Sequence, residues 1–154
     1  MKAINNILIV VALLLLQACA GYPKKAQVLP GGLKVSRVKD WELKSGDYAP
    51  NVSQQITLVP VKGKDPNLRA LVMLTFEYGK RDGFVNGTKR IREEWVTVQD
   101  TRVPLVVYGN NIARYYCLDF YRNGSAYFAT LVISGSCDEE FYKMEMLRIV
   151  GSLM

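Results

Sequence analysis

Closely spaced strand candidates in the second half of the chain limit its fold more than any other feature. They cover about 96 to 108, 112 to 122 and 126 to 134. The separators, Gly109-Asn110-Asn111 and Asn123-Gly124, are short and rich in turn-forming residues. Such short connections suit antiparallel neighbours, because parallel strands need a crossover of about a dozen residues or more. This part of the chain therefore predicts an antiparallel meander.

Earlier segments add strands to this sheet. Apolar and polar residues alternate at 33–35 and 56–58, and residues 70–76 are nearly all apolar. Both patterns are typical of strands. Residues 88–95, which are mostly charged, are expected to form a short helix.

The last segment changes from a period of two to a helical period. Apolar residues that recur every three or four positions predict one helical face, made of Phe141, Met144, Leu147, Val150 and Met154. Ser136 and Glu139 have the spacing of a capping box at its start. The predicted fold class is α+β, an antiparallel sheet of about five to six strands with a C-terminal amphipathic helix packed on one face.

The N-terminus has the order of a cleavable signal peptide. Lys2 precedes an apolar run from Ile7 to Leu16. A membrane-spanning helix needs about 20 apolar residues, and this run is shorter. The run leads into Leu16-Gln17-Ala18-Cys19, which resembles the lipobox of bacterial lipoproteins, with Gln17 in place of the usual small or β-branched residue. Ordinary secretion is the alternative, because small residues also flank Cys19 in Ala18-Cys19-Ala20.

The lipobox resemblance implies a membrane anchor. It makes residues 1–18 a signal peptide and Cys19 the lipidation site, and Ala20 rather than aspartate after the cysteine implies the outer membrane. Residues 19–32 contain prolines and glycines and are expected to form a lipidated tether. Residues 33–154 have the length of a single domain, which would lie in the periplasm.

The predicted order of elements in the domain resembles that of a known family. Three segments carry the resemblance. These are a helix-like segment at 88–95, the meander at 96–134 with Tyr115-Tyr116-Cys117-Leu118, and the ending from Phe141 to Leu153. In these segments the domain is similar to the PsbP/DcrB-like family. The bacterial members of that family include small periplasmic lipoproteins. The resemblance implies a binding or accessory role and carries over no catalytic residue.

The two remaining cysteines are candidates for a disulfide. Cys117 and Cys137 would lie in an oxidising compartment, which favours a bond between them. A two-residue turn at 123–124, however, places Cys117 opposite Thr130 rather than Cys137. The two sulfur atoms then meet only if the chain folds back beyond that strand.

Composition argues against an enzyme. The chain has no histidine, which removes the commonest general base, the usual catalytic triads and most zinc sites. No metal and no cofactor are expected. The acids at 138–140 suit the positive end of a helix, and a hydrolase that uses them as a carboxylate pair is an alternative.

Charge and tyrosines indicate where partners could bind. Loss of residues 1–18 removes one lysine and no acid, so the net charge falls from +6 to +5. Such a surface suits anionic neighbours in the envelope or simply aids solubility, and no nucleic-acid partner is expected. Two groups of residues are interface candidates, one basic and one aromatic, namely Lys89, Arg90, Arg92, Tyr115 and Tyr121.

Each group also has a structural interpretation. The basic residues stand beside Glu93 and Glu94, as on a solvated face. Tyr115 and Tyr121 share one face of a strand, where tyrosines either pack half-buried or form an interface. The sequence thus predicts a non-enzymatic accessory or assembly lipoprotein that contacts an envelope or secretion machine. The alternative is an inhibitor or ligand-binding lipoprotein.

Overall fold

One antiparallel sheet carries most of the described chain. The computed structural model describes residues 26–36, 38–44, 55–80 and 87–154. The strand order is β3-β4-β5-β9-β8-β7-β6. The seven strands are β3 (Trp41–Lys44), β4 (Gln55–Pro60), β5 (Arg69–Tyr78), β6 (Lys89–Val98), β7 (Thr101–Gly109), β8 (Arg114–Arg122) and β9 (Ser125–Ser136).

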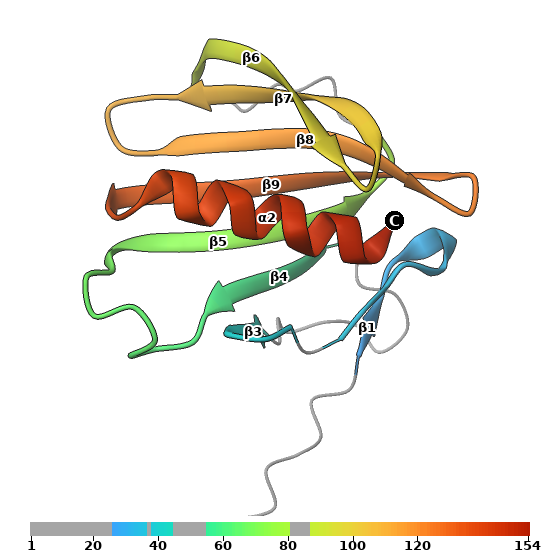
Figure 1. Ribbon diagram of the computed structural model, residues 1–154, viewed down its shortest axis with the longest axis horizontal. Coiled ribbons are helices and arrows are strands. Elements are labelled where there is room, and N and C mark those ends of the chain that lie inside the picture. The colour runs from blue at the N-terminus through green and yellow to red at the C-terminus, as the bar shows by residue number, and fades with distance from the viewer. Residues whose placement is uncertain (1–25, 37, 45–54, 81–86) are drawn as a thin grey trace, which may run out of the picture.

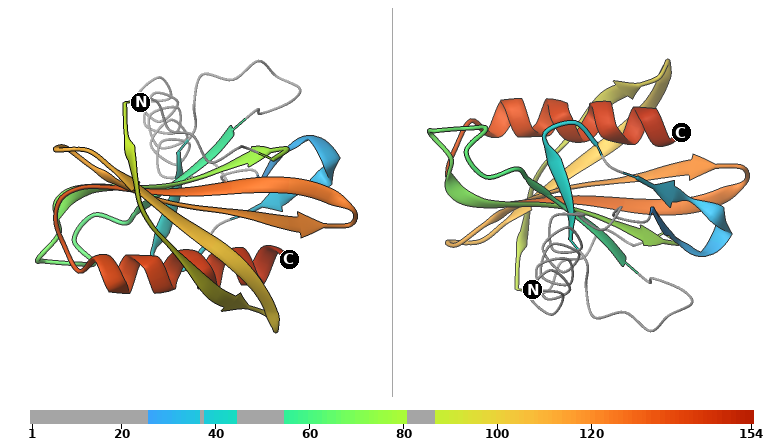
Figure 2. Two further views of the ribbon diagram at one scale, coloured as in Figure 1. Left: turned by 90° about the horizontal axis from the view of Figure 1, so that it is seen from above. Right: turned by 90° about the horizontal axis from the view of Figure 1, so that it is seen from below.

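A single C-terminal helix, α2 (Glu139–Leu153), lies across one face of this sheet. Figure 2 shows the helix from two sides, always on the same face. The predicted class, an antiparallel sheet with a C-terminal helix on one face, is confirmed. The predicted five to six strands were too few, because the main sheet has seven and a further pair lies outside it.

The predicted helix at 88–95 was wrong, since these residues form most of β6. The strand pairs with β7 along its whole length, with one irregularity between Arg90 and Arg92. A tight turn at Gln99 and Asp100, both with positive φ of 44° and 63°, then leads into β7. The predicted strand at 96–108 therefore consists of parts of two strands.

The hairpin of β8 and β9 has the register that its turn predicted. Asn123 and Gly124 both have positive φ, and Cys117 lies opposite Thr130. Cys137 follows the end of β9, which places it roughly 20 Å from Thr130 at the usual rise of a strand. The expected disulfide between Cys117 and Cys137 is accordingly not formed in the structure.

The start of α2 differs from the predicted capping box. Asp138, not Ser136, is the N-cap residue, and its carboxylate accepts a hydrogen bond of 3.0 Å from the amide of Phe141. Ser136 is still the last residue of β9. The acids at 139 and 140 lie in the first turn, where the helix dipole favours negative charge.

The predicted apolar face of α2 was wrong in its first half only, because Val150 is buried and Leu147 and Met154 pack against the core. Phe141 and Met144 are exposed, and Leu147 is only partly buried. The face that packs on the sheet is offset by about one residue and is formed by Tyr142, Met146, Ile149, Val150 and Leu153.

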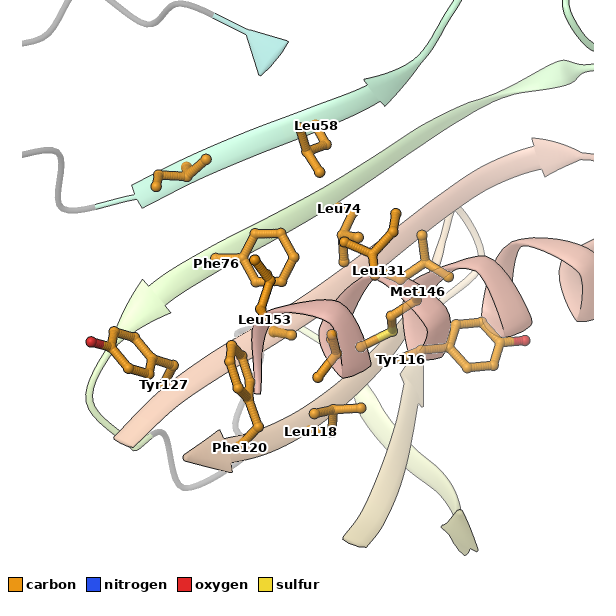
Figure 3. Packing of buried hydrophobic residues seen from close by; sticks show 14 of the residues in the cluster. Leu58, Leu74, Phe76, Tyr116, Leu118, Phe120, Tyr127, Leu131, Met146 and Leu153 are labelled. Atoms are coloured by element: carbon orange, nitrogen blue, oxygen red, sulfur yellow. The ribbon is translucent and has the colours of Figure 1, made fainter. Parts of the chain in front are cut away.

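The core lies between this helix face and the sheet. Figure 3 shows Met146 beside Leu131 of β9 and Tyr116 of β8, with Leu74 of β5 close by. Met146, Leu131 and Leu74 have no exposed surface. Because successive residues of a strand point to opposite faces, alternate residues of the central strands face α2.

A short hairpin before the main sheet completes the core. β1 (Gln27–Val28) pairs antiparallel with β2 (Lys34–Val35), and η1 (Pro30–Gly32) joins them. Leu29 and Leu33 are buried in the common core. Residues 27–32, which the sequence assigned to the tether, therefore pack as part of the folded domain.

Tyr127 of β9 attaches this hairpin to the sheet. Its hydroxyl accepts a hydrogen bond of 3.2 Å from the amide of Leu33 and donates one of 3.1 Å to the carbonyl oxygen of Pro30. Gly31 lies so close that a Cβ atom there would be 2.5 Å from the hydroxyl oxygen, and its φ is +79°. Position 31 therefore requires glycine, because the side chain of any other residue there would clash with Tyr127, and that residue would have to adopt a positive φ.

Candidate functional site

A cleft between β3 and the N-terminal half of α2 is a candidate site within the part of the chain that the structure describes. It has a volume of about 580 Å³. The strand side contributes Trp41 and Pro60, and the helix contributes Phe141, Tyr142, Glu145 and Arg148. A turn after β4 closes one end with Lys64 and Asp65. The site thus combines segments from both ends of the domain sequence.

Aromatic rings form the floor of this β3–α2 cleft. Trp41 and Tyr142 are almost fully buried, with ring centroids 6.1 Å apart and an interplanar angle of 87°. Phe141 packs edge-on against Tyr142 at 5.1 Å. Phe141 as a residue is 52% exposed, so it presents an apolar surface to a ligand in the cleft.

Polar contacts hold the floor in place. The indole nitrogen of Trp41 donates to Glu145 at 3.2 Å, and Arg148 donates two hydrogen bonds of 2.8 Å to the same carboxylate. Arg148 and, to a lesser extent, Trp41 lower the pKa of Glu145. Glu145 is therefore an ionised structural partner and is poorly suited to donate a proton.

A hydrogen bond to a carboxylate also holds Tyr142 in place. Its hydroxyl donates a hydrogen bond of 3.0 Å to the carboxylate of Asp65. Burial and then this carboxylate raise the pKa of Tyr142, which keeps the hydroxyl protonated. This contact joins the helix to the turn after β4, so the cleft is pre-organised.

Charges of both signs surround the opening. Lys39, Lys64 and Arg148 supply three cations, and Asp40, Asp65 and Glu145 supply three anions. Lys64 lies 3.4 Å from Asp40. An apolar floor with a balanced rim suits a segment of another protein better than a simple anion or cation.

The structure places the predicted basic residues elsewhere. Lys89, Arg90 and Arg92 lie on β6, at the sheet edge opposite β3. Arg90 forms an ion pair with Glu93, and Arg92 lies 3.8 Å from Glu94. These residues do not line the cleft.

The predicted tyrosines also lie apart from the cleft. Tyr115 and Tyr121 are on the face of β8 that points away from α2, and Tyr121 is 49% exposed. Tyr116 points the other way, is buried, and donates a hydrogen bond of 2.6 Å to Glu139. The predicted alternation along this strand is therefore confirmed.

Sequence reasoning missed Trp41, Asp65 and Tyr142 as site residues. Trp41 and Tyr142 are separated by about a hundred positions, and only the sheet order brings them together. The one available signal was the combination of a tryptophan within a short alternating segment and an aromatic pair at the helix start.

Cys137 should be the only one of the described cysteines that reacts quickly in the native protein. It is partly exposed, whereas Cys117 is 2% exposed. Burial, followed by the charges of Glu139, Asp65 and Asp138, raises the pKa of the Cys137 thiol. The thiolate is the reactive form of a cysteine. The alkylation rate of Cys137 should therefore keep rising with pH beyond the pH at which the alkylation rate of a cysteine in a short peptide becomes constant.

Mass spectrometry after pulses of iodoacetamide at increasing pH measures this rate. Glu139→Gln should lower the thiol pKa and speed the reaction at a fixed pH near 8. Equal labelling of Cys117 and Cys137 in the native protein would contradict the assigned burial.

Comparisons with family models, curated proteins and solved structures gave no match to this chain. Among the helices of the described segments, none has the length and apolar character needed to cross a membrane.

Proposed function

We propose that this protein is a non-enzymatic lipoprotein of the bacterial envelope that binds a partner protein through the β3–α2 cleft. The observation that carries the proposal is the exposed ring of Phe141 at a pre-organised aromatic cleft. Aromatic anchors surrounded by a polar rim are the usual centre of protein interfaces. Lipid on Cys19 would hold this surface at the outer membrane, facing the periplasm.

Exposed apolar surface extends beyond the cleft and supports a protein partner. Met144, one turn along α2 from Phe141, is 55% exposed. Two large apolar side chains on the outer side of a helix cost solubility, and such patches commonly mark binding surfaces. The partner would insert an apolar side chain beside Phe141 and place charged groups against the rim.

The chemistry of the cleft supports binding rather than catalysis. Its three carboxylates already have structural partners. Arg148 and Trp41 hold Glu145, Tyr142 holds Asp65, and Lys64 is ion-paired with Asp40. The chain also has no histidine to act as a general base.

A ligand-binding lipoprotein is the second candidate. The volume of about 580 Å³ supports it. Small-molecule sites usually measure about 300–1,000 Å³. A cross-linking experiment distinguishes the two candidates. A protein partner in the cleft can be cross-linked covalently to this chain, whereas a small ligand gives no cross-link to another chain.

Site-specific photo-cross-linking in intact cells tests the proposal. A photo-reactive phenylalanine analogue replaces either Phe141 in the cleft or Tyr121 on the opposite face, two positions that are 52% and 49% exposed. We expect one discrete cross-linked band from position 141 and none from position 121. Lys39→Glu, which reverses an exposed charge at the rim, should remove the band.

The opposite pattern overturns the proposal. A band from position 121 alone assigns the partner to the outer face of the sheet. The absence of a band at position 141, with normal amounts of protein, excludes a protein partner in the cleft and favours the small ligand.

A further inference from the structure

The edge strand β6 offers a second, independent surface. In the described sheet β6 has β7 as its only neighbour, so one side of its backbone faces outward over ten residues, Lys89–Val98. The opposite edge, β3, has four residues. A long edge is a ready template for another strand, and proteins normally shorten it or protect it with charge.

The side chains of β6 divide into two halves of different character. The first half is basic, with Lys89, Arg90 and Arg92, and the second half begins with Glu93 and Glu94. When a second copy runs antiparallel about Glu93, Arg92 of each copy lies opposite Glu94 of the other. The two Glu93 carboxylates then meet at the axis, where the Arg90 side chain that is ion-paired with each of them offsets their repulsion. Parallel pairing in register would instead place like charges side by side.

The two faces of the strand agree with this pairing. Arg92 and Glu94 lie opposite Val107 and Leu105 of β7, which are buried under α2, so both point to the helix face of the sheet. A two-fold axis through Glu93 therefore places Arg92 of one copy opposite Glu94 of the other on the same face.

Glu94 is also incompletely satisfied within its own chain. Its Oε1 atom lies 3.8 Å from Arg92 and 3.5 Å from Lys143, and it accepts no hydrogen bond from the described residues. The Glu94 side chain as a whole is 33% exposed, so a second guanidinium group can approach its other oxygen from outside. Because the two cations of its own chain hold Oε1, the accessible part of the Glu94 carboxylate is left for a donor from the second copy.

Large apolar side chains lie along the same edge. Trp95 is 55% exposed and Ile91 is 46% exposed. Charge alone would protect the edge, whereas exposed tryptophan and isoleucine indicate a surface that becomes covered.

We propose that β6 binds β6 of a second copy of this chain, antiparallel and about a two-fold axis at Glu93, so that the two sheets become continuous. Closed two-fold pairing of this kind uses the same patch on both copies. The β6–β6 interface lies at the opposite sheet edge from the β3–α2 cleft, so each copy keeps its cleft accessible.

Charge exchange between two full-length, differently tagged copies tests this pairing. Arg92→Glu alone and Glu94→Arg alone should each abolish co-purification of the two tags from detergent extracts, because like charges then meet across the axis. Co-expression of one Arg92→Glu copy with one Glu94→Arg copy should restore co-purification. Arg69→Glu, an equal charge change at an exposed position on β5, should leave self-association intact.

A cysteine at the axis provides a second measurement that does not depend on charge. Glu93→Cys should give a disulfide-linked dimer under mild oxidation, whereas Lys89→Cys, away from the axis, should not. A wild-type protein that does not co-purify with itself, or charge variants that associate as well as the wild type, would overturn the proposal.

Discussion

Replacing Met146 with alanine is expected to lower the free energy of unfolding by about 2–5 kcal/mol. Met146 has no exposed surface and packs between α2 and the central strands (Figure 3). The smaller side chain leaves a cavity that the surrounding sheet cannot fill by collapse. A domain of this size has a total stability of about 5–15 kcal/mol, so the variant should melt far below the wild type.

Met144→Ala is the matched control for this experiment. It removes the same side chain from the same helix, two residues away, but at a position that is 55% exposed. Its effect should stay within about 0.5 kcal/mol. Urea denaturation followed by circular dichroism measures both variants. A larger loss for Met144→Ala than for Met146→Ala would show that α2 packs through the face that the sequence pattern suggested.

Cys19→Ser is expected to release the protein from the membrane completely. A serine oxygen cannot form the thioether that lipidation of the lipobox requires, and without acyl chains no strong membrane attachment remains. Fractionation of cells should move the protein from the membrane pellet to the soluble fraction. Incorporation of radiolabelled palmitate should fall to background.

Cys137→Ser is the control for the loss of a thiol. It lies in the folded domain and should leave both membrane attachment and palmitate labelling unchanged. A wild-type protein that is already soluble would indicate ordinary secretion after Ala18. Palmitate labelling that persists in Cys19→Ser would place the lipid on another residue.

The sequence predicted the central hairpin well because its information is local. Asn123 and Gly124 adopt the positive φ that a two-residue turn needs, and that turn alone determines the pairing of Cys117 with Thr130. The β6–β7 turn was missed because Gln99 and Asp100 reach the same conformation without a glycine.

The sequence of β6 was misleading for a different reason. As an edge strand it needs few apolar side chains, and only Val98 at its end is buried. Its arginine, lysine and glutamate residues are good helix formers, so the segment was taken for a helix. The helix α2 was misread because it carries two apolar stripes, of which the exposed one contains Phe141 and Met144. Both stripes satisfy a spacing of three or four residues.

The cleft could not be predicted because its walls meet only through the sheet order. Trp41 comes from the first strand of the main sheet, and Tyr142 from the last helix. Their contact depends on the sheet order, because β4 and β5 lie between β3 and β9, the strand that leads into α2. No local pattern contains that information.

The position of β9 has a consequence for the order in which the molecule can assemble. β9 lies in the middle of the sheet and joins β3–β4–β5 to β6–β7–β8, yet it comes almost last in the chain. Its pairing with β5 closes a loop of many residues, which is entropically slow. A chain that emerges N-terminus first, from a ribosome or across a membrane, therefore has no complete core until nearly all of it has emerged.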